Sequence, residues 1–196
     1  NQLQQEMQEL GAAGQEIRSH VLAYLGNICR ANGQNEAALQ YFEQALSGVD
    51  TSKSPSVASA AVCYGAALLE KGDVEVAERL LRDGVSRLGD SPNDAAFLVV
   101  ALRDLARLEQ DRGKQDKALA LLYRAEGSAD GRIQQDCAFW LCLYDQRGWV
   151  HFSRGDYEAA MTDFSQAIAQ SASEELMIQP LEGAGRCCIA LGRAEE

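Results

Sequence analysis

Apolar residues recur along this chain with the periodicity of amphipathic helices, and five of the periodic segments end at a glycine. These glycines are Gly33, Gly72, Gly113, Gly155 and Gly192. Glycine commonly follows the last turn of a helix, because it adopts the left-handed conformation there without strain. Another apolar-periodic segment clearly follows each of the first four glycines. The pattern therefore predicts pairs of helices joined by tight turns.

Other positions repeat together with the glycines, which lie 37 to 42 residues apart. Alanine stands five residues after the turn (Ala38, Ala77, Ala118, Ala160), a large apolar residue nine after it (Phe42, Leu81, Leu122, Phe164), a small residue twelve after it (Ala45, Gly84, Ala125, Ala167), and a small residue seven before it (Gly26, Gly65, Ala106, Gly148, Gly185). Two antiparallel helices approach closely only where both carry small side chains. We therefore expect the small residue before the turn to meet the alanine after it, and the large residue to fill the space between pairs.

This repeat predicts an all-α fold, an α-solenoid of antiparallel helix pairs wound into a right-handed superhelix with about four to five repeats. We interpret residues 1–196 as one such domain, with repeats at 15–50, 54–90, 91–130 and 131–172 and an incomplete fifth at 173–196. Residues 1–14 fit either the second helix of a preceding repeat or a frayed terminal helix. The chain starts at Asn1 and ends within the pattern, so we expect a fragment of a longer protein.

Prolines mark several expected helix starts. Ser54-Pro55 and Ser91-Pro92 are typical of an N-cap serine followed by proline in the first helical position, with helices running to about Lys71 and Arg112. A further helix is expected from about residue 133 to residue 153. Pro180 is expected in the first turn of the last helix, or as a kink if that helix begins at Ser173.

The repeated columns resemble the tetratricopeptide repeat. Leu25-Gly26, Tyr64-Gly65, Ala38, Phe42 and Ala45 carry the resemblance, with Gly155-Asp156-Tyr157 at a turn, and it extends over about residues 15–196. The repeats are longer than the usual 34 residues and are similar to the lengthened repeats of kinesin light chains, of polarity adaptors and of bacterial regulator sensor domains. Glu109, Arg147 and His151 occupy columns that pack inward in the family.

The charge and composition of the chain argue against several classes of function. The formal net charge of −11 argues against nucleic acid and against an anionic membrane surface, because both require a concentrated basic surface. No apolar run is long enough to span a membrane. The six cysteines contain no C-x-x-C pair, and Cys137, Cys142 and His151 lack the spacing of a zinc finger. We expect no metal, reduced cysteines and an intracellular, cytoplasmic protein.

The sequence offers no catalytic constellation. His20 and His151 are the only histidines, and neither has an obvious nucleophile as partner. Every motif glycine is explained by a turn or a helix crossing, so no phosphate-binding loop is left. We expect no enzyme activity, no cofactor and no small-molecule substrate.

The resemblance implies that the first helix of each pair lines a concave groove that binds a protein or peptide partner. The candidate groove residues are Tyr24, Asn27, Arg30, Arg103, Arg107, Asp145, Gln146, Trp149 and Arg186. Arg103 and Arg107 stand one helical turn apart and suit carboxylates of a peptide, while Trp149 suits an aromatic anchor. The alternative is that Asp104 and Asp111 neutralise the two arginines and that Trp149 packs between repeats.

One family specificity is absent from the sequence. Domains that bind the acidic tails of heat-shock chaperones use asparagines and basic residues, and only Asn27 fits, because Cys63, Val100 and Asp104 stand at the other positions. The leading hypothesis is an interaction scaffold or adaptor. The alternatives are a sensor arm of a larger regulator or protease, and a structural subunit of a large assembly.

Overall fold

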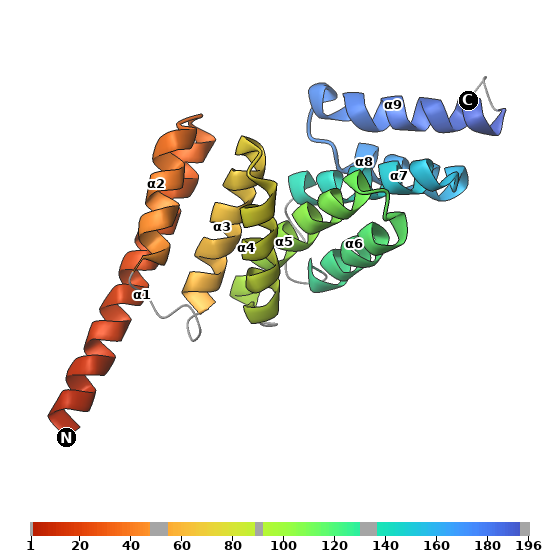
Figure 1. Cartoon of the computed structure of the whole chain (residues 1–196). Helices are drawn as coiled ribbons and strands as arrows, with labels where there is room; N and C mark the ends of the chain where they lie inside the picture. The colour runs from red at the N-terminus through yellow and green to blue at the C-terminus, as the bar shows by residue number, and fades with distance from the viewer. Residues whose placement is uncertain (1, 48–54, 89–91, 130–136, 193–196) are drawn as a thin grey trace. The chain divides into compact units, whose positions relative to one another are not determined.

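A computed structural model describes residues 2–47, 55–88, 92–129 and 137–192, and within these residues the chain forms nine helices and no strand (Figure 1). The helices are α1 (Gln2–Ala31), α2 (Asn35–Leu46), α3 (Pro55–Lys71), α4 (Val74–Arg87), α5 (Pro92–Asp111), α6 (Gln115–Ala129), α7 (Cys137–Arg154), α8 (Tyr157–Gln170) and α9 (Glu174–Leu191). The expected all-α class is confirmed.

The turn glycines take the conformation that the sequence predicts. Gly33, Gly72, Gly113, Gly155 and Gly192 are the described residues with positive φ, between 71° and 95°. At the α7–α8 turn, the N–H of Gly155 donates to the carbonyl of Phe152 and the N–H of Asp156 donates to that of His151, both at 3.0 Å. These bonds satisfy carbonyls at the end of α7, and the left-handed residue reverses the chain into α8.

Some helix boundaries differ from those expected, and others lie outside the described residues. Helix α1 runs without interruption for 30 residues, so residues 2–14 extend the first helix. Because no turn breaks α1, these residues do not form a separate second helix of a preceding repeat. Helix α9 begins at Glu174 with Ser173 as its N-cap, so Pro180 lies buried in the interior of the helix, which agrees with the alternative start at Ser173 and not with a place in the first turn. The serines at 54 and 91 and the expected helix start at 133 lie outside the described residues.

Small residues before the turn allow close approach of paired helices, but their direct neighbour is not the expected alanine. A Cβ added to Gly26 would lie 2.6 Å from Phe42, and one added to Gly148 would lie 2.7 Å from Phe164. At Gly65 the alanine is among the nearest neighbours, through the Ala77 carbonyl at 3.2 Å, beside Leu81 at 3.0 Å. The large residue therefore occupies the space that a glycine side chain leaves free.

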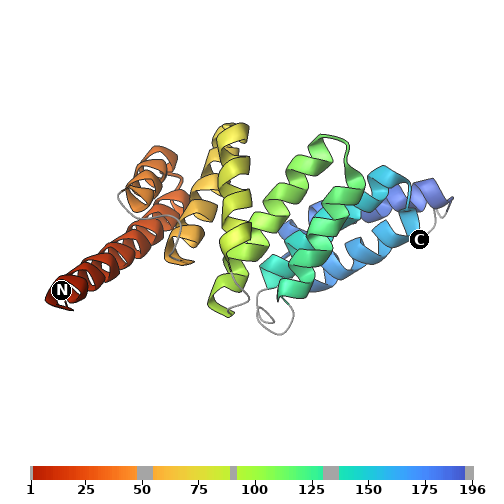
Figure 2. The same ribbon diagram turned by 60° about the horizontal axis from the view of Figure 1, so that its bottom comes forward.

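The chain divides into two compact units, Asn1–Asp104 (unit 1) and Leu105–Glu196 (unit 2), with the boundary inside α5. In unit 1, α1 packs on α2 and α3 packs on α4, and the pairs join where α3 contacts α1 and α2. The α3–α4 pair lies side by side in both views (Figures 1 and 2). Phe42 is fully buried at the α2–α3 contact together with Ala38, Cys63 and Ala67.

Unit 2 repeats this arrangement. Helix α8 packs between α7 and α9, and α6 packs against α7. Phe164 of α8 is fully buried with Ala160 and Cys187, and half-buried Trp149 and Phe152 pack against this cluster. Phe164 therefore has in unit 2 the place that Phe42 has in unit 1, nine residues after the turn glycine in both cases.

Candidate functional site

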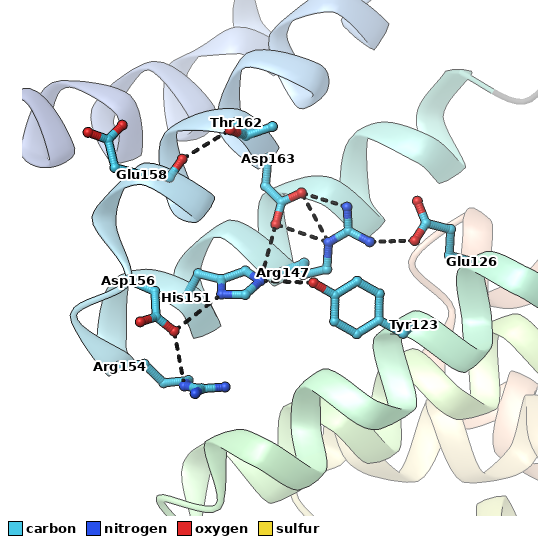
Figure 3. Close-up of polar contacts among 9 residues, drawn as sticks. All are labelled: Tyr123, Glu126, Arg147, His151, Arg154, Asp156, Glu158, Thr162 and Asp163. Atoms are coloured by element: carbon cyan, nitrogen blue, oxygen red, sulfur yellow. Dashed lines mark hydrogen bonds and ion pairs between the residues drawn. The ribbon is translucent and has the colours of Figure 1, made fainter.

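The most densely connected polar group in unit 2 is centred on Arg147 of α7 (Figure 3). Its Nε donates to both carboxylate oxygens of Asp163 in α8 at 3.0 Å, and its Nη2 donates to Oδ1 at 2.6 Å. Its Nη1 donates to Glu126 of α6. Arg147 and Asp163 are only 6% and 4% exposed. One guanidinium thus links three helices inside the unit.

Aromatic side chains surround this guanidinium. Its Cζ lies 4.8 Å from the centre of the Tyr123 ring and 5.2 Å from that of Tyr144, within the range of cation–π attraction. His151 Nε2 lies 3.3 Å from the Tyr123 hydroxyl and 3.8 Å from Asp163 Oδ2. We call Tyr123, Glu126, Arg147, His151 and Asp163 the buried ionic network.

Electrostatics keep Arg147 charged although it is buried. Burial lowers the pKa of Arg147, but hydrogen bonds and charge from Asp163 and Glu126 raise it further, so the pKa lies above its usual range. Because a buried charge is tolerated only when it is paired, the network fixes the alignment of α6, α7 and α8. Arg147, His151 and Asp163 are buried, whereas Glu126 is half-buried and Tyr123 is 51% exposed, so the network reaches from the interior of the unit to its surface.

Sequence reasoning found only part of this network. Arg147 and His151 lie in the inward-facing columns where the sequence placed them, but Tyr123, Glu126 and Asp163 were missed. A signal was present: Arg147 and Asp163 replace apolar residues that stand at the same two positions in earlier repeats (Leu25 with Tyr41, Tyr64 with Leu80, Leu105 with Leu121). When one repeat has residues of opposite charge at two positions that are apolar in the other repeats and that face each other, an ion pair is indicated.

A second cluster in unit 2 lies nearer the surface and contains three of the candidate groove residues. Trp149 of α7 packs edge-on against Phe152 and Phe164, with ring centres 5.8 and 5.2 Å apart. The guanidinium of Arg186, from α9, lies 5.5 Å from the Trp149 ring centre and also donates to Glu182 at 2.6 Å. Asp145, one turn before Trp149, hydrogen-bonds its side chain. We call Asp145, Trp149 and Arg186 the Trp149 cluster.

The pKa of Asp145, the acidic residue of this cluster, is shifted from its ordinary value. Burial raises the pKa of Asp145 to about 6, and the hydrogen bond from Trp149 offsets only part of the effect. One carboxylate oxygen, Oδ1, is buried without a hydrogen-bond partner. Near neutral pH the group is mostly ionised, so a half-buried tryptophan lies between a poorly satisfied carboxylate and a guanidinium.

Two other candidate groove residues in unit 1 are engaged with α3. Asn27 Nδ2 donates to Cys63 Sγ at 3.3 Å, and Arg30 pairs with Glu70 at 2.9 Å. Arg30 also lines a cavity of about 240 Å³ between α1, α2 and α3. The other lining residues are Asn35, Glu36, Ala38, Leu39, Ala67, Glu70 and Lys71. Tyr24, by contrast, is 67% exposed on α1.

The remaining candidates are separate. Nη2 of Arg103 lies 4.0 Å from the carboxylate of the buried Asp104, which agrees with the alternative that Asp104 neutralises this arginine. Arg107 is exposed, and Gln146 is half-buried on α7. Of the nine candidates, the structure therefore brings Asp145, Trp149 and Arg186 into one cluster, and Asn27 and Arg30 into contact with α3.

No group of three His, Cys, Asp or Glu side chains within the described ranges has the arrangement of a metal site. In the same ranges, every helix is too short or too polar to cross a bilayer.

These observations define a class: a repeat protein built from helical hairpins. Family models of the tetratricopeptide repeat match residues 25–95 and residues 143–173, together more than half of the chain. The chain belongs to the tetratricopeptide repeat family, whose fold generally serves as a scaffold for protein–protein interaction.

Solved structures agree on the fold. A thermophilic tetratricopeptide protein of Thermus thermophilus is 24% identical, with a TM-score of 0.60 over 89% of this chain and 84% of that one. BtubC of P. vanneervenii is 15% identical, with a TM-score of 0.73 over 97% and 81% of the two chains. Tetratricopeptide-like repeats of a Podospora anserina protein named after kinesin light chains are 17% identical, with a TM-score of 0.66 over 92% and 89%. A comparison with curated proteins finds no match.

Proposed function

We propose that this chain is an interaction scaffold that binds a peptide or a partner helix, and that the Trp149 cluster is the centre of its binding surface. The observation that carries this proposal is the position of Trp149 between the Asp145 carboxylate and the Arg186 guanidinium, at a surface formed by two first-type helices, α7 and α9. Tryptophan and arginine are the residues that most often dominate binding energy at protein interfaces.

The chemistry of the cluster suits a polypeptide. The exposed part of the indole accepts an apolar side chain, Asp145 accepts a hydrogen bond from a backbone N–H or a cationic group, and Arg186 donates to a carbonyl or carboxylate. Phe152 and Phe164 support the ring from behind, so little side-chain freedom is lost when a ligand binds. The net charge of −11 supports a protein partner over nucleic acid. Reduced cysteines and this role fit an intracellular, cytoplasmic setting.

One other groove candidate of unit 2 is available to a ligand. Arg107 is exposed, and we rank it as a secondary contact, with the energetic centre at Trp149. In unit 1, Tyr24 is exposed by itself, whereas Asn27 and Arg30 are bound to α3.

The test begins with a peptide-display library to find ligands of the full chain, followed by affinity measurements on variants. Trp149→Ala and Arg186→Glu should each weaken binding at least about tenfold, as expected for a central anchor. Arg82→Glu is a matched control, because Arg82 is also exposed and also pairs with a glutamate four residues earlier, at 2.8 Å. Circular dichroism should be the same for all variants.

Two results would contradict the proposal. If Trp149→Ala and Arg186→Glu leave the affinity unchanged, the ligand is held elsewhere. If Arg103→Glu combined with Arg107→Glu abolishes binding while Trp149→Ala does not, the arginines of α5 are the centre.

A further inference from the structure

The cavity of about 240 Å³ in unit 1 has a buried apolar part and a charged edge. In its apolar part, Ala38 is fully buried, Ala67 is 7% exposed and Leu39 is half-buried. The other lining residues are charged or polar: Arg30, Asn35, Glu36, Glu70 and Lys71. We call this space, between the ends of α1 and α3 and the start of α2, the α1–α3 cavity.

In unit 2, aromatic side chains stand at two of the positions that line this cavity. Arg30 stands three residues before its turn glycine, and Asn35 stands two residues after it. The same positions of unit 2 are taken by Phe152 and Tyr157, whose ring centres lie 5.3 Å apart, edge to face. Phe152 also packs against the buried cluster around Phe164. Unit 2 therefore has two packed rings where unit 1 has an arginine and an asparagine.

A third lining position carries an unusually small residue. Ala67 stands five residues before its turn glycine, and larger residues stand at this position in the other repeats: Ile28, Leu108, Val150 and Cys187. Val150 and Cys187 are fully buried, so this position belongs to the packed interior of unit 2. Because protein interiors are close-packed, the smaller side chain in unit 1 leaves space that the other repeats fill.

We propose that the α1–α3 cavity binds one aromatic side chain, phenylalanine or tyrosine, of a partner polypeptide. The bound ring takes the place that aromatic side chains of the chain itself have in unit 2. A cavity of about 150 Å³ is large enough to hold benzene, so about 240 Å³ holds one such ring with its link to a backbone. Asn35, Glu36 and Lys71 are exposed at the edge, where the backbone of a ligand can pass.

Arg30 favours an aromatic ligand over an aliphatic one. Its Nη1 donates to Glu70 at 2.9 Å, which holds the guanidinium beside the cavity. Arg186 shows the same combination in unit 2, because it pairs with Glu182 and lies 5.5 Å from the centre of the Trp149 ring. A ring in the cavity can form this cation–π contact with Arg30, whereas a leucine side chain cannot.

This site lies wholly within unit 1 and does not depend on the Trp149 cluster, which lies in unit 2. The experiment titrates the full chain, labelled at its alanine and leucine methyl groups, with N-acetyl-phenylalaninamide and follows the methyl signals by NMR. The signals of Ala38, Leu39 and Ala67 should shift saturably, with a dissociation constant on the order of 1 mM for a ligand of this size. N-acetyl-leucinamide should bind about threefold more weakly, and N-acetyl-alaninamide at least about tenfold more weakly.

Two variants fill the cavity in different ways. Ala67→Val introduces the residue that Val150 supplies in unit 2, and should weaken binding of the phenylalanine probe at least about tenfold. Ala96→Val is the matched control, because Ala96 is exposed on α5 and is not among the lining residues. Arg30→Phe combined with Asn35→Tyr installs the ring pair of unit 2 and should also abolish binding, so the test does not depend on one variant.

Three results would overturn the proposal: no shift of these methyl signals up to about 10 mM probe, equal affinity for the phenylalanine and leucine probes, or undiminished binding to the variant that carries both rings. The second result would make the cavity a site for aliphatic side chains as well. Trp149→Ala should leave the methyl shifts unchanged, and ligands of the Trp149 cluster should bind Ala67→Val as they bind the wild type. Failure of this proposal is therefore distinguishable from failure of the proposed function.

Discussion

Arg147 of α7 and Asp163 of α8 form a forked ion pair at two positions that the other helix pairs fill with apolar or aromatic side chains. Both residues are almost fully buried, and Glu126 and two tyrosine rings complete the surroundings of the guanidinium. Apolar contacts would hold the same helices together with less dependence on exact register. The ion pair requires α7 and α8 to meet in one alignment, because any shift would leave buried charges unpaired.

Breaking this pair should destabilise unit 2 strongly. Arg147→Met leaves Asp163 buried without its cation, and we expect the free energy of unfolding to fall by about 3–5 kcal/mol. The double variant Arg147→Met with Asp163→Leu should recover most of this loss, because it restores the apolar pair of the other repeats. Urea denaturation followed by circular dichroism measures both. Equal loss in the single and double variants would show that the apolar pair does not fit here.

The repeated glycine column allows a paired test of packing. Gly148→Ala places a Cβ 2.7 Å from the Phe164 ring and should cost about 1–3 kcal/mol of unfolding free energy through overpacking. Gly185→Ala, at the equivalent position of α9, meets no atom within 4 Å and should stabilise the helix by about 0.5–1 kcal/mol. Thermal denaturation compares the two. A loss of stability in Gly185→Ala would mean that something covers this face in the free protein.

Asp145 should make stability depend on pH in a defined direction. Its pKa is raised to about 6 in the folded chain, above the ordinary value of 3.8, so the folded state holds this proton more tightly than the unfolded state. Relative to Asp145→Asn, the wild type is therefore most stable below pH 4 and loses stability as the pH rises towards and through 6, by about 2 kcal/mol. Denaturation of both proteins between pH 4 and 7.5 gives the difference. A constant difference over this range would contradict a raised pKa.

The cysteines should differ in reactivity. Cys63 and Cys187 are buried, and burial raises the pKa of both thiols, whereas Cys142 is exposed on α7. Because the thiolate is the reactive form, a thiol reagent at pH 8 should label Cys142 at least about tenfold faster than Cys63 or Cys187. Peptide mass spectrometry locates the label, and Cys142→Ser should remove the fast phase. Rapid labelling of Cys63 would show that α3 opens readily.

The repeat pattern predicted the helix pairs and their turns because these depend on residues that recur. Every turn glycine adopts a positive φ, since the turn itself requires it. The length of α1 was not predictable in the same way, because Gly11 and Gly14 favour a helix boundary in this segment, whereas the helix continues through both glycines without a break. Pro180 shows a similar limit: local propensity left open whether it stands in the first turn or inside a helix that begins near Ser173, and α9, with Ser173 as its N-cap, has it in the interior.

The sites were predictable to a smaller extent. Helical spacing placed Asp145 and Trp149 on one face of α7, but the contact between Trp149 and Arg186 depends on how α9 packs. The buried ionic network joins residues from α6, α7 and α8, and their separation in sequence hides the contact. The sequence suggested Arg103 as a ligand-binding residue. Its proximity to Asp104 depends on side-chain conformations, which the spacing of residues in the sequence does not specify.

Phe164 fills the space above Gly148 and also contacts Gly183, so a single ring forms part of both the α7–α8 contact and the α8–α9 contact. Helix α9 cannot separate from α8 without exposing that ring, and α8 cannot separate from α7 without removing the support of α9. We therefore expect the two contacts to unfold in one cooperative event, so that amide hydrogen exchange in α7, α8 and α9 reports a common opening free energy.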